Sequence, residues 1–262
     1  MITISRRLPT GTIAGSRALR LIERNILVYR HGWIVIVSGF FEPVFYLIGI
    51  GFGLGTLVGD VEGISYQAFV APGLMAAAAM NGALFESTFN LFFKLKYAKT
   101  YDAILSTPLG PPDIAIGEVG WALMRGAVYA TAFILVMLAL GLVTSAWGLL
   151  AIPGAMLIGL AAAAMGTATT TFMRKWQDFD LVTVVTMPLF LFSATFFPIT
   201  VYPDWLRIVV ELTPLYRGVH MLRSFTTGQV DAVILIDIAY LATLGLIGTA
   251  ITSRRLRRLL LT

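Results

Sequence analysis

The sequence has no cysteine, only two histidines and few charges. Without cysteine the chain can form neither disulfides nor thiolate metal sites. His31 and His220 are too few for an imidazole metal cluster. Charged residues make up 13% of the 262 residues, whereas hydrophobic residues make up 58%. A water-soluble domain would expose too much apolar surface with this composition, so we expect the chain to use lipid as its solvent.

Motifs of common catalytic and nucleotide-binding sites are missing too. None of the four lysines (Lys94, Lys96, Lys99 and Lys175) follows the glycines of a GxxxxGKS/T phosphate loop. The HExxH and GxSxG patterns of metalloproteases and serine hydrolases do not occur. The sequence therefore predicts a chain that is not an enzyme and binds no cofactor of its own.

Long apolar stretches recur along the chain, and each is about long enough to cross a bilayer as a helix. They cover residues 33–57, 66–93, 114–141, 146–172, 181–199 and 230–252. The expected fold is an all-α integral membrane protein in which residues 1–262 form a single transmembrane domain. A cytoplasmic segment (1–32) precedes the six-helix bundle (33–252), and a basic cytoplasmic tail (253–262) follows it.

The net charge of +5 is better explained by membrane topology than by nucleic-acid binding. The basic residues gather in the first segment, after the second and fourth stretches, and in the tail, with Arg125 in the first turns of the helix that follows the second loop; Arg207, Arg217 and Arg223 lie between the fifth and sixth stretches. Basic loops mark the cytoplasmic side, so both termini should be cytoplasmic. The first apolar run begins near Trp33, after many polar and basic residues, so no cleavable signal peptide is expected.

Residues 14–31 form an amphipathic pattern ahead of the first apolar stretch. Three arginines share one helical face, and Leu19, Ile22 and Ile26 share another. Such a helix can lie in the cytoplasmic membrane interface, or it can extend the first crossing into the cytosol.

A second amphipathic pattern lies in the loop between the second and third stretches. Tyr97, Tyr101, Ile104 and Leu105 recur at helical spacing and predict a short helix with one apolar face, which Pro108 ends. A helix of this kind can rest on the membrane surface or enter a groove on another protein. Periodicity alone does not choose between these two.

Residues 198–228 are too polar to span and too apolar to be a free loop. Asp204 is placed to cap a helix that ends near Glu211, and Pro214 precedes a second piece over residues 215–225. We expect a helical pair that dips into the outer leaflet, with Trp205 at headgroup depth.

Four glycines in the first stretch stand at GxxxG spacings, which allow helices to approach closely: Gly49, Gly51, Gly53 and Gly55. They can pack against a helix of the same subunit or against another subunit.

Two carboxylates, Glu42 and Glu86, lie inside predicted crossings, where an ionised group is costly and usually faces protein or water. They are candidates to line an internal path. Alternatively, each pairs with a donor on a neighbouring helix, such as Ser38, Asn81 or Asn90. Glu118 and Arg125, near the start of the third crossing, are expected at the membrane interface.

Several stretches taken together resemble the permease subunits of ABC-2 type exporters, and more narrowly the nodulation-factor (lipo-chitooligosaccharide) and antibiotic export permeases. The stretches are Glu42-Pro43 with the glycines that follow, Phe85–Thr88, Lys99–Leu105, Gly117-Glu118, Phe197-Pro198, and Pro214–Arg217 with Arg223. The resemblance covers almost the whole chain. One departure is the stretch 199–213, which is longer than the pattern suggests.

The resemblance implies an exporter in a bacterial plasma (inner) membrane. Two permeases, identical or related, would form the pathway, and two separate ATPase subunits would hold ATP and Mg. The helix of Tyr97, Tyr101, Ile104 and Leu105 would be the coupling helix, and the outer pair with Trp205, Pro214, Arg217 and Arg223 would shape the exit.

The apolar wall suits an amphiphile such as a drug, a lipid or a lipo-oligosaccharide. Three alternatives remain open at this point: a polysaccharide-export permease, a polytopic membrane enzyme such as an acyl- or glycosyltransferase, and a membrane scaffold.

Overall fold

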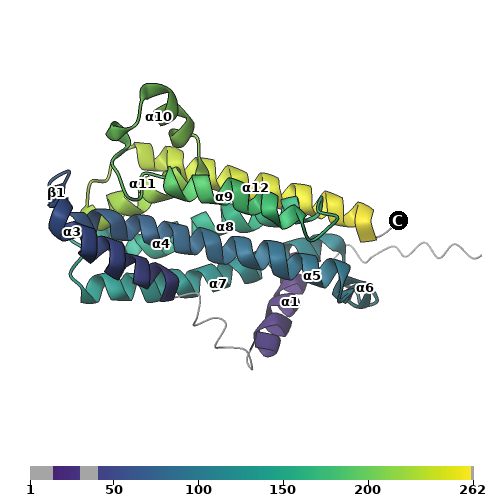
Figure 1. Ribbon diagram of the computed structural model, residues 1–262. Coiled ribbons are helices and arrows are strands. Elements are labelled where there is room, and N and C mark those ends of the chain that lie inside the picture. Colours follow the sequence, from purple (N-terminus) through teal and green to yellow (C-terminus); the bar gives the residue numbers. More distant parts are fainter. Residues whose placement is uncertain (1–13, 30–40, 261–262) are drawn as a thin grey trace, which may run out of the picture.

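The computed structural model describes residues 14–29 and 41–260, which are almost entirely helical (Figure 1). Five helices are long and apolar enough to cross a membrane. They run over Phe41–Val58, Tyr66–Lys96, Pro111–Ala139, Ala146–Thr170 and Val233–Leu260. These five match five of the six predicted crossings.

Several of these helices are composite. The first contains a π-helical stretch, η1 (Leu47–Phe52), followed by α3 (Gly53–Val58). The second joins α4 (Tyr66–Phe85), the π-helical η2 (Glu86–Asn90) and α5 (Leu91–Lys96). The third and fifth are α7 (Pro111–Ala139) and α12 (Val233–Leu260), and the fourth joins the 3-10 turn η3 (Ala146–Leu150) to α8 (Ala151–Thr170).

Shorter elements complete the described chain. They are α1 (Ala14–Tyr29), α6 (Thr100–Leu105), α9 (Asp178–Leu191), the 3-10 turn η4 (Ile199–Val201), α10 (Asp204–Glu211) and α11 (Pro214–Thr227). A two-residue hairpin, β1 (Asp60–Val61) and β2 (Ile64–Ser65), links α3 to α4 with Asp60 opposite Ser65. Its turn residues Glu62 and Gly63 both have positive φ, as a tight hairpin turn requires.

The predicted fifth crossing differs most from the structure. It was expected over 181–199, but α9 ends at Leu191 after fourteen residues. Beyond the end of the helix, Ala194 adopts a left-handed conformation (φ 56°), and Pro198 follows. The Arg223 guanidinium holds this turn by donating to the Ala194 carbonyl at 2.7 Å. The final helix differs in the other direction, since α12 continues to Leu260 through most of the expected separate tail.

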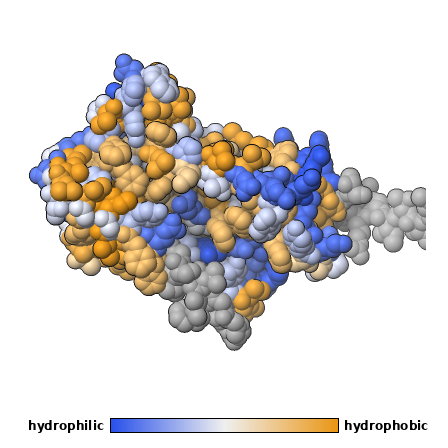
Figure 2. All heavy atoms as spheres, in the orientation of Figure 1, coloured by the Kyte–Doolittle hydropathy of each residue, from blue (hydrophilic) through white to orange (hydrophobic). Residues whose placement is uncertain are grey.

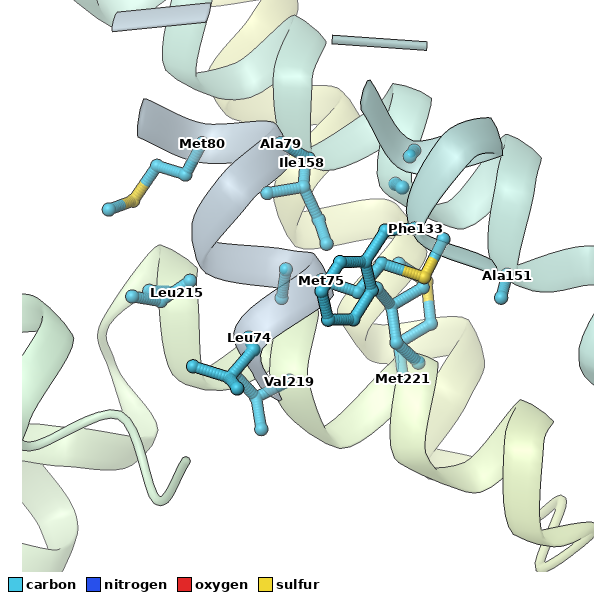
Figure 3. Close-up of a cluster of buried hydrophobic side chains, with 14 of the residues drawn as sticks. Leu74, Met75, Ala79, Met80, Phe133, Ala151, Ile158, Leu215, Val219 and Met221 are labelled. Carbon is cyan, nitrogen blue, oxygen red and sulfur yellow. The ribbon is translucent and has the colours of Figure 1, made fainter. Parts of the chain in front are cut away.

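The core lies where α4, α7, α8, α11 and α12 meet. Figure 3 shows Met75 of α4, Phe133 of α7 and Met221 of α11 directed toward one another. Many of the remaining core residues are alanines of α4 and α8. Small side chains allow close helix approach, which is how helices associate in lipid.

Helices α8 and α12 approach each other closely in this core. A Cβ added at Gly248 would lie 2.6 Å from the Ala164 carbonyl carbon. At the same level Thr167 and Thr252 share a hydrogen bond of 2.9 Å. Backbone therefore meets backbone here, with no flexible side chain that can move aside.

We predict that Gly248→Ala destabilises the protein by about 1–3 kcal/mol, because the added methyl overpacks the contact. Gly53→Ala is the matched control, since a Cβ at Gly53 has no neighbour within 4 Å; it should be neutral or slightly stabilising in a helix. Thermal unfolding in detergent, followed by intrinsic fluorescence, measures both. Equal midpoints for the two variants would contradict the close α8–α12 packing.

The two ends of the bundle differ in character. Figure 1 places α6 and the C-terminal end of α12 at one end, and the β1–β2 hairpin and α10 toward the other. Hydrophilic residues gather at the α6 end, whereas apolar residues cover much of the rest of the visible face (Figure 2). Which side of the membrane each end faces stays a prediction.

Candidate functional site

A buried charge network between α1, α4–α5 and α7 has Glu86 at its centre. The Glu86 carboxylate accepts from Arg125 Nη1 at 2.6 Å and from Asn90 Nδ2 at 2.6 Å. The Tyr29 hydroxyl of α1 donates to the same carboxylate at 3.2 Å. Glu86 is 1% exposed, so its charge is stabilised by these partners and not by solvent. The π-helical η2, which begins at Glu86, forms this part of the site.

The network continues toward α6 through Lys94. Its ammonium lies 3.8 Å from Glu86 and 2.8 Å from Glu118. Arg125 Nε in turn donates to the Tyr129 hydroxyl at 3.0 Å. Two cations and two carboxylates thus alternate through the protein interior, so the network is close to neutral overall.

Four polar atoms next to this network are buried without a hydrogen-bond partner among the described residues. They are Asn25 Nδ2 of α1, Tyr101 Oη of α6, and Glu118 Oε1 and Trp121 Nε1 of α7. Burial raises the pKa of Tyr101 well above its usual value, and the Glu118 carboxylate adds to that rise. Burial and Glu86 likewise raise the pKa of Tyr29. Both phenols therefore stay protonated at physiological pH and can act as donors.

A cavity of about 530 Å³ adjoins the network, and we call it the Glu42 cavity. Its wall is formed mainly by apolar and aromatic side chains of the first helix, α4 and α9, including Tyr46, Phe85 and Phe190. Glu42, Asn81 and Arg125 are polar groups of this lining. Arg125 therefore belongs to both the network and the cavity wall.

The two predicted path residues have different environments. Glu42 is exposed and lines the cavity, and no described residue forms an ion pair or hydrogen bond with it. Ser38, one of its suggested partners, lies outside the described residues. Glu86 instead pairs with donors on neighbouring elements, as its alternative interpretation proposed; Asn90 was foreseen, whereas Arg125 and Tyr29 were not.

Sequence reasoning missed the pairing of Glu118 and Arg125 with this network. Both side chains are buried, at 3% and 6% exposure. The signal was present, because Glu86 and Arg125 are opposite charges in consecutive apolar stretches, and charges within membrane helices usually pair with one another.

The predicted coupling helix is shorter than expected and packs differently. Lys99 has a positive φ of 46° and separates Tyr97, at the end of α5, from the six residues of α6. Tyr101 and Ile104 are buried against Leu21, Leu91 and Leu256, and Leu105 is partly buried there. The apolar face that was expected to meet a partner thus belongs to the core of this chain. The exposed surface of the loop includes Tyr97, Lys99, Asp102 and Ala103.

Two helices, α10 and α11, occur where the sequence predicted the outer helical pair, and their place in the outer leaflet stays a prediction. Asp204 is the first residue of α10, but its side chain makes no capping bond. Trp205 is exposed, and Pro214 begins α11 behind the Thr213 cap.

Two arginines of α11 attach it to the bundle. Arg217 pairs with the fully buried Asp237 of α12 at 3.1 Å, and His220 Nδ1 lies 2.6 Å from the same carboxylate. Arg223 donates to the Phe69 carbonyl at 3.1 Å and stacks on its ring. These residues hold α11 in place.

The glycines of the first helix divide between two faces. Gly51 and Gly55 face Gln67 of α4, and a Cβ at Gly55 would lie 2.5 Å from its amide nitrogen. Gly49 and Gly53 have no described neighbour within 4 Å. The predicted packing within one subunit therefore accounts for half of the motif.

Among residues 14–29 and 41–260, no group of histidine and carboxylate side chains could hold a metal ion. The site thus consists of a mainly apolar cavity with a few polar groups, and of a charge network that leads from it to α5, next to the loop before α6.

Comparison with known proteins defines the family. Residues 17–226 match the family model of the ABC-2 type transporter. The chain is 32% identical to nodulation protein J of Rhizobium leguminosarum bv. viciae over 96% of this chain and 98% of that protein. It is 31% identical to nodulation protein J of Rhizobium meliloti (strain 1021), over 79% and 80% of the two chains. It is 27% identical to the inner membrane transport permease YadH of Escherichia coli (strain K12), over 70% of each chain.

Fold and site define a multi-pass, helical membrane transport protein. The chain belongs to the ABC-2 type transporter family. Members of this family are transport components and not catalysts themselves, and they normally work with ABC ATPase subunits.

Proposed function

We propose that this chain is the permease subunit of an ATP-driven exporter that moves an amphiphilic cargo out across a bacterial plasma (inner) membrane. It crosses the membrane six times, with α9 as the fifth crossing and both termini in the cytoplasm. It works with a second permease, identical or related, and with two ATPase subunits that carry ATP and Mg. Its cargo is a drug, a lipid or a lipo-oligosaccharide.

The Glu42 cavity is the observation that carries this proposal. Ligand cavities combine a mostly apolar wall with a few well-placed polar groups. Here aromatic residues of four helices contribute to the wall, and Glu42, Asn81 and Arg125 supply polar groups. An amphiphile can place its apolar part on the wall and its hydroxyl or amide groups on these residues.

The charge network supports a connection from this cavity to the ATPase. Arg125 lines the cavity, and its partner chain of Glu86, Lys94 and Glu118 leads to α5 and to the junction with α6. ATP can act only by favouring one arrangement of the permease over another. Movement of α5 and α6 by the ATPase would change the charges that face the cargo. The ATPase would contact the exposed loop residues Tyr97, Lys99, Asp102 and Ala103.

The first experiment is a pull-down of the tagged chain in mild detergent from its native membrane, followed by mass spectrometry. We expect a soluble ABC ATPase to co-purify, with or without a second permease. A pull-down without an ATPase would contradict the proposed function.

The second experiment tests the cavity in proteoliposomes that contain the whole complex, with a fluorescently labelled lipo-chitooligosaccharide as the probe. Glu42→Gln should raise the probe concentration for half-maximal transport about tenfold, as expected for loss of a hydrogen bond to a charged group. Asp60→Asn, an exposed carboxylate change in the hairpin, should leave it unchanged. Equal half-maximal probe concentrations for Glu42→Gln and the unaltered complex would show that Glu42 does not contact the cargo.

A further inference from the structure

A second cavity, which we call the α9 cavity, lies between α9 and the helices α4, α8 and α12. Its volume is also about 530 Å³. Met80, Ile158, Ala162, Val185, Leu189 and Leu241 form much of its wall. Thr186 of α9 lines both this cavity and the Glu42 cavity, so α9 separates the two.

The α9 cavity is long. Its lining follows α8 from Ile158 to Thr169, which at 1.5 Å per residue is about 17 Å, and continues to Phe172 in the turn beyond the helix. Half of a bilayer's hydrocarbon core is roughly 15 Å. A cavity of this length extends through about one leaflet and ends near the turn that precedes α9.

The polar atoms of its wall are satisfied within the chain. The hydroxyls of Thr88 and Thr169 donate to carbonyls of the preceding helical turn, those of Leu84 and Met165. The Asp178 carboxylate accepts from the backbone nitrogens of Arg174 and Lys175. These polar groups of the wall therefore need no hydrogen bond from a ligand. The part of a ligand that fits inside the cavity is apolar.

The mouth of the cavity carries cationic side chains beside the Asp178 carboxylate. Phe172 lines the cavity, and the guanidinium of Arg255 lies over its ring at 4.1 Å. Arg255 Nε is buried without a hydrogen-bond partner among the described residues. Arg174 and Lys175 are exposed in the same turn, beside the exposed Trp176. An anionic headgroup complements this set, and tryptophan is typical of headgroup depth.

The loose packing of α9 agrees with an occupant that is not part of this chain. Phe179 is the single buried residue among those described in α9. Val185 is 59% exposed although it lines the cavity. The other described helices make few contacts with α9. Contacts with a bound ligand would therefore stabilise the position of this helix.

We propose that the α9 cavity binds one acyl chain of an anionic membrane phospholipid, whose headgroup lies against Arg255, Arg174 and Lys175. The lipid comes from the leaflet on the α6 side, which is the cytoplasmic leaflet in the topology proposed above. This site is separate from the cargo path, and the lipid would hold α9 between the two cavities.

The test uses the purified full chain in nanodiscs with two photoreactive probes. One is phosphatidylglycerol with a diazirine on the acyl chain, and the other is phosphatidylcholine with the same chain. Peptide mapping by mass spectrometry should locate the phosphatidylglycerol cross-links on residues 158–189 and 241–244. Equal cross-linking by both lipids, or cross-links spread evenly over all helices, would overturn the proposal.

Two pairs of variants make the test specific. Val185→Trp fills the cavity from an exposed position on α9 and should remove the mapped cross-links; Leu246→Trp, on an outward position of α12, should keep them. Arg255→Gln should weaken phosphatidylglycerol retention about fivefold in native mass spectrometry, whereas Arg257→Gln, exposed on the same helix, should have a smaller effect.

These outcomes are independent of transport. A pull-down without an ATPase would contradict the proposed function but would not affect the proposal of a lipid site. If the Val185→Trp variant kept the mapped cross-links, the proposed lipid site would be wrong.

Discussion

Arg125→Ala should destabilise the folded protein by about 3–5 kcal/mol, because it leaves the Glu86 carboxylate buried without its closest cation. Glu86 is 1% exposed, and its distance to Arg125 Nη1 is 2.6 Å. Lys94 lies farther away, at 3.8 Å, and already pairs with Glu118. The measurement is thermal unfolding in detergent, together with the yield of monodisperse protein.

The double variant Arg125→Ala/Glu86→Gln separates charge from packing. Glutamine keeps the shape of the side chain and can still accept from Asn90 and Tyr29, so most of the stability should return. Glu23→Gln is a control on an exposed carboxylate of α1 and should change stability little. A double variant as unstable as Arg125→Ala alone would mean that Arg125 acts by filling space.

Ile104→Asp should prevent stable folding of the α6 end, and the protein should be lost from the membrane fraction. Ile104 is 8% exposed within a cluster that includes Leu21, Leu91 and Leu256, and an unpaired carboxylate there is costly. Ala103→Asp, at an exposed neighbouring position, is the matched control. It should fold and insert normally while it reduces ATP-driven transport, since it alters the proposed ATPase-facing surface.

The comparison of the two variants distinguishes two descriptions of α6. The amphipathic pattern by itself predicts that Ile104→Asp inserts and only loses coupling. The packing in the structure predicts loss of the protein. Normal amounts of a folded but uncoupled Ile104→Asp protein would favour the first description.

The long helices could be predicted because hydropathy over about twenty residues determines them locally. The outer pair of α10 and α11 was also predictable, since Pro203 and Pro214 mark where each piece starts. What the sequence did not show was which distant residues meet. The apolar face of α6 is covered by Leu21 and Leu256, which lie far from it in the sequence at opposite ends of the chain.

The same reason explains what was missed at the site. Glu86 and Arg125 are 39 positions apart, and no periodicity relates them. Each was considered alone, as a path residue and as an interface residue. A rule that buried opposite charges in neighbouring helices must be paired would have suggested the contact, although not the share of Lys94, Glu118 and Tyr29 in it.

The length of α9 has a consequence for the surrounding bilayer. Fourteen helical residues rise only about 21 Å, which is less than the roughly 30 Å hydrocarbon thickness. In the proposed six-crossing topology, this hydrophobic mismatch draws the two membrane surfaces together beside α9. Reconstitution in shorter-chain lipids should therefore favour the protein, and the distance that a cargo travels through hydrocarbon is shortest next to this helix.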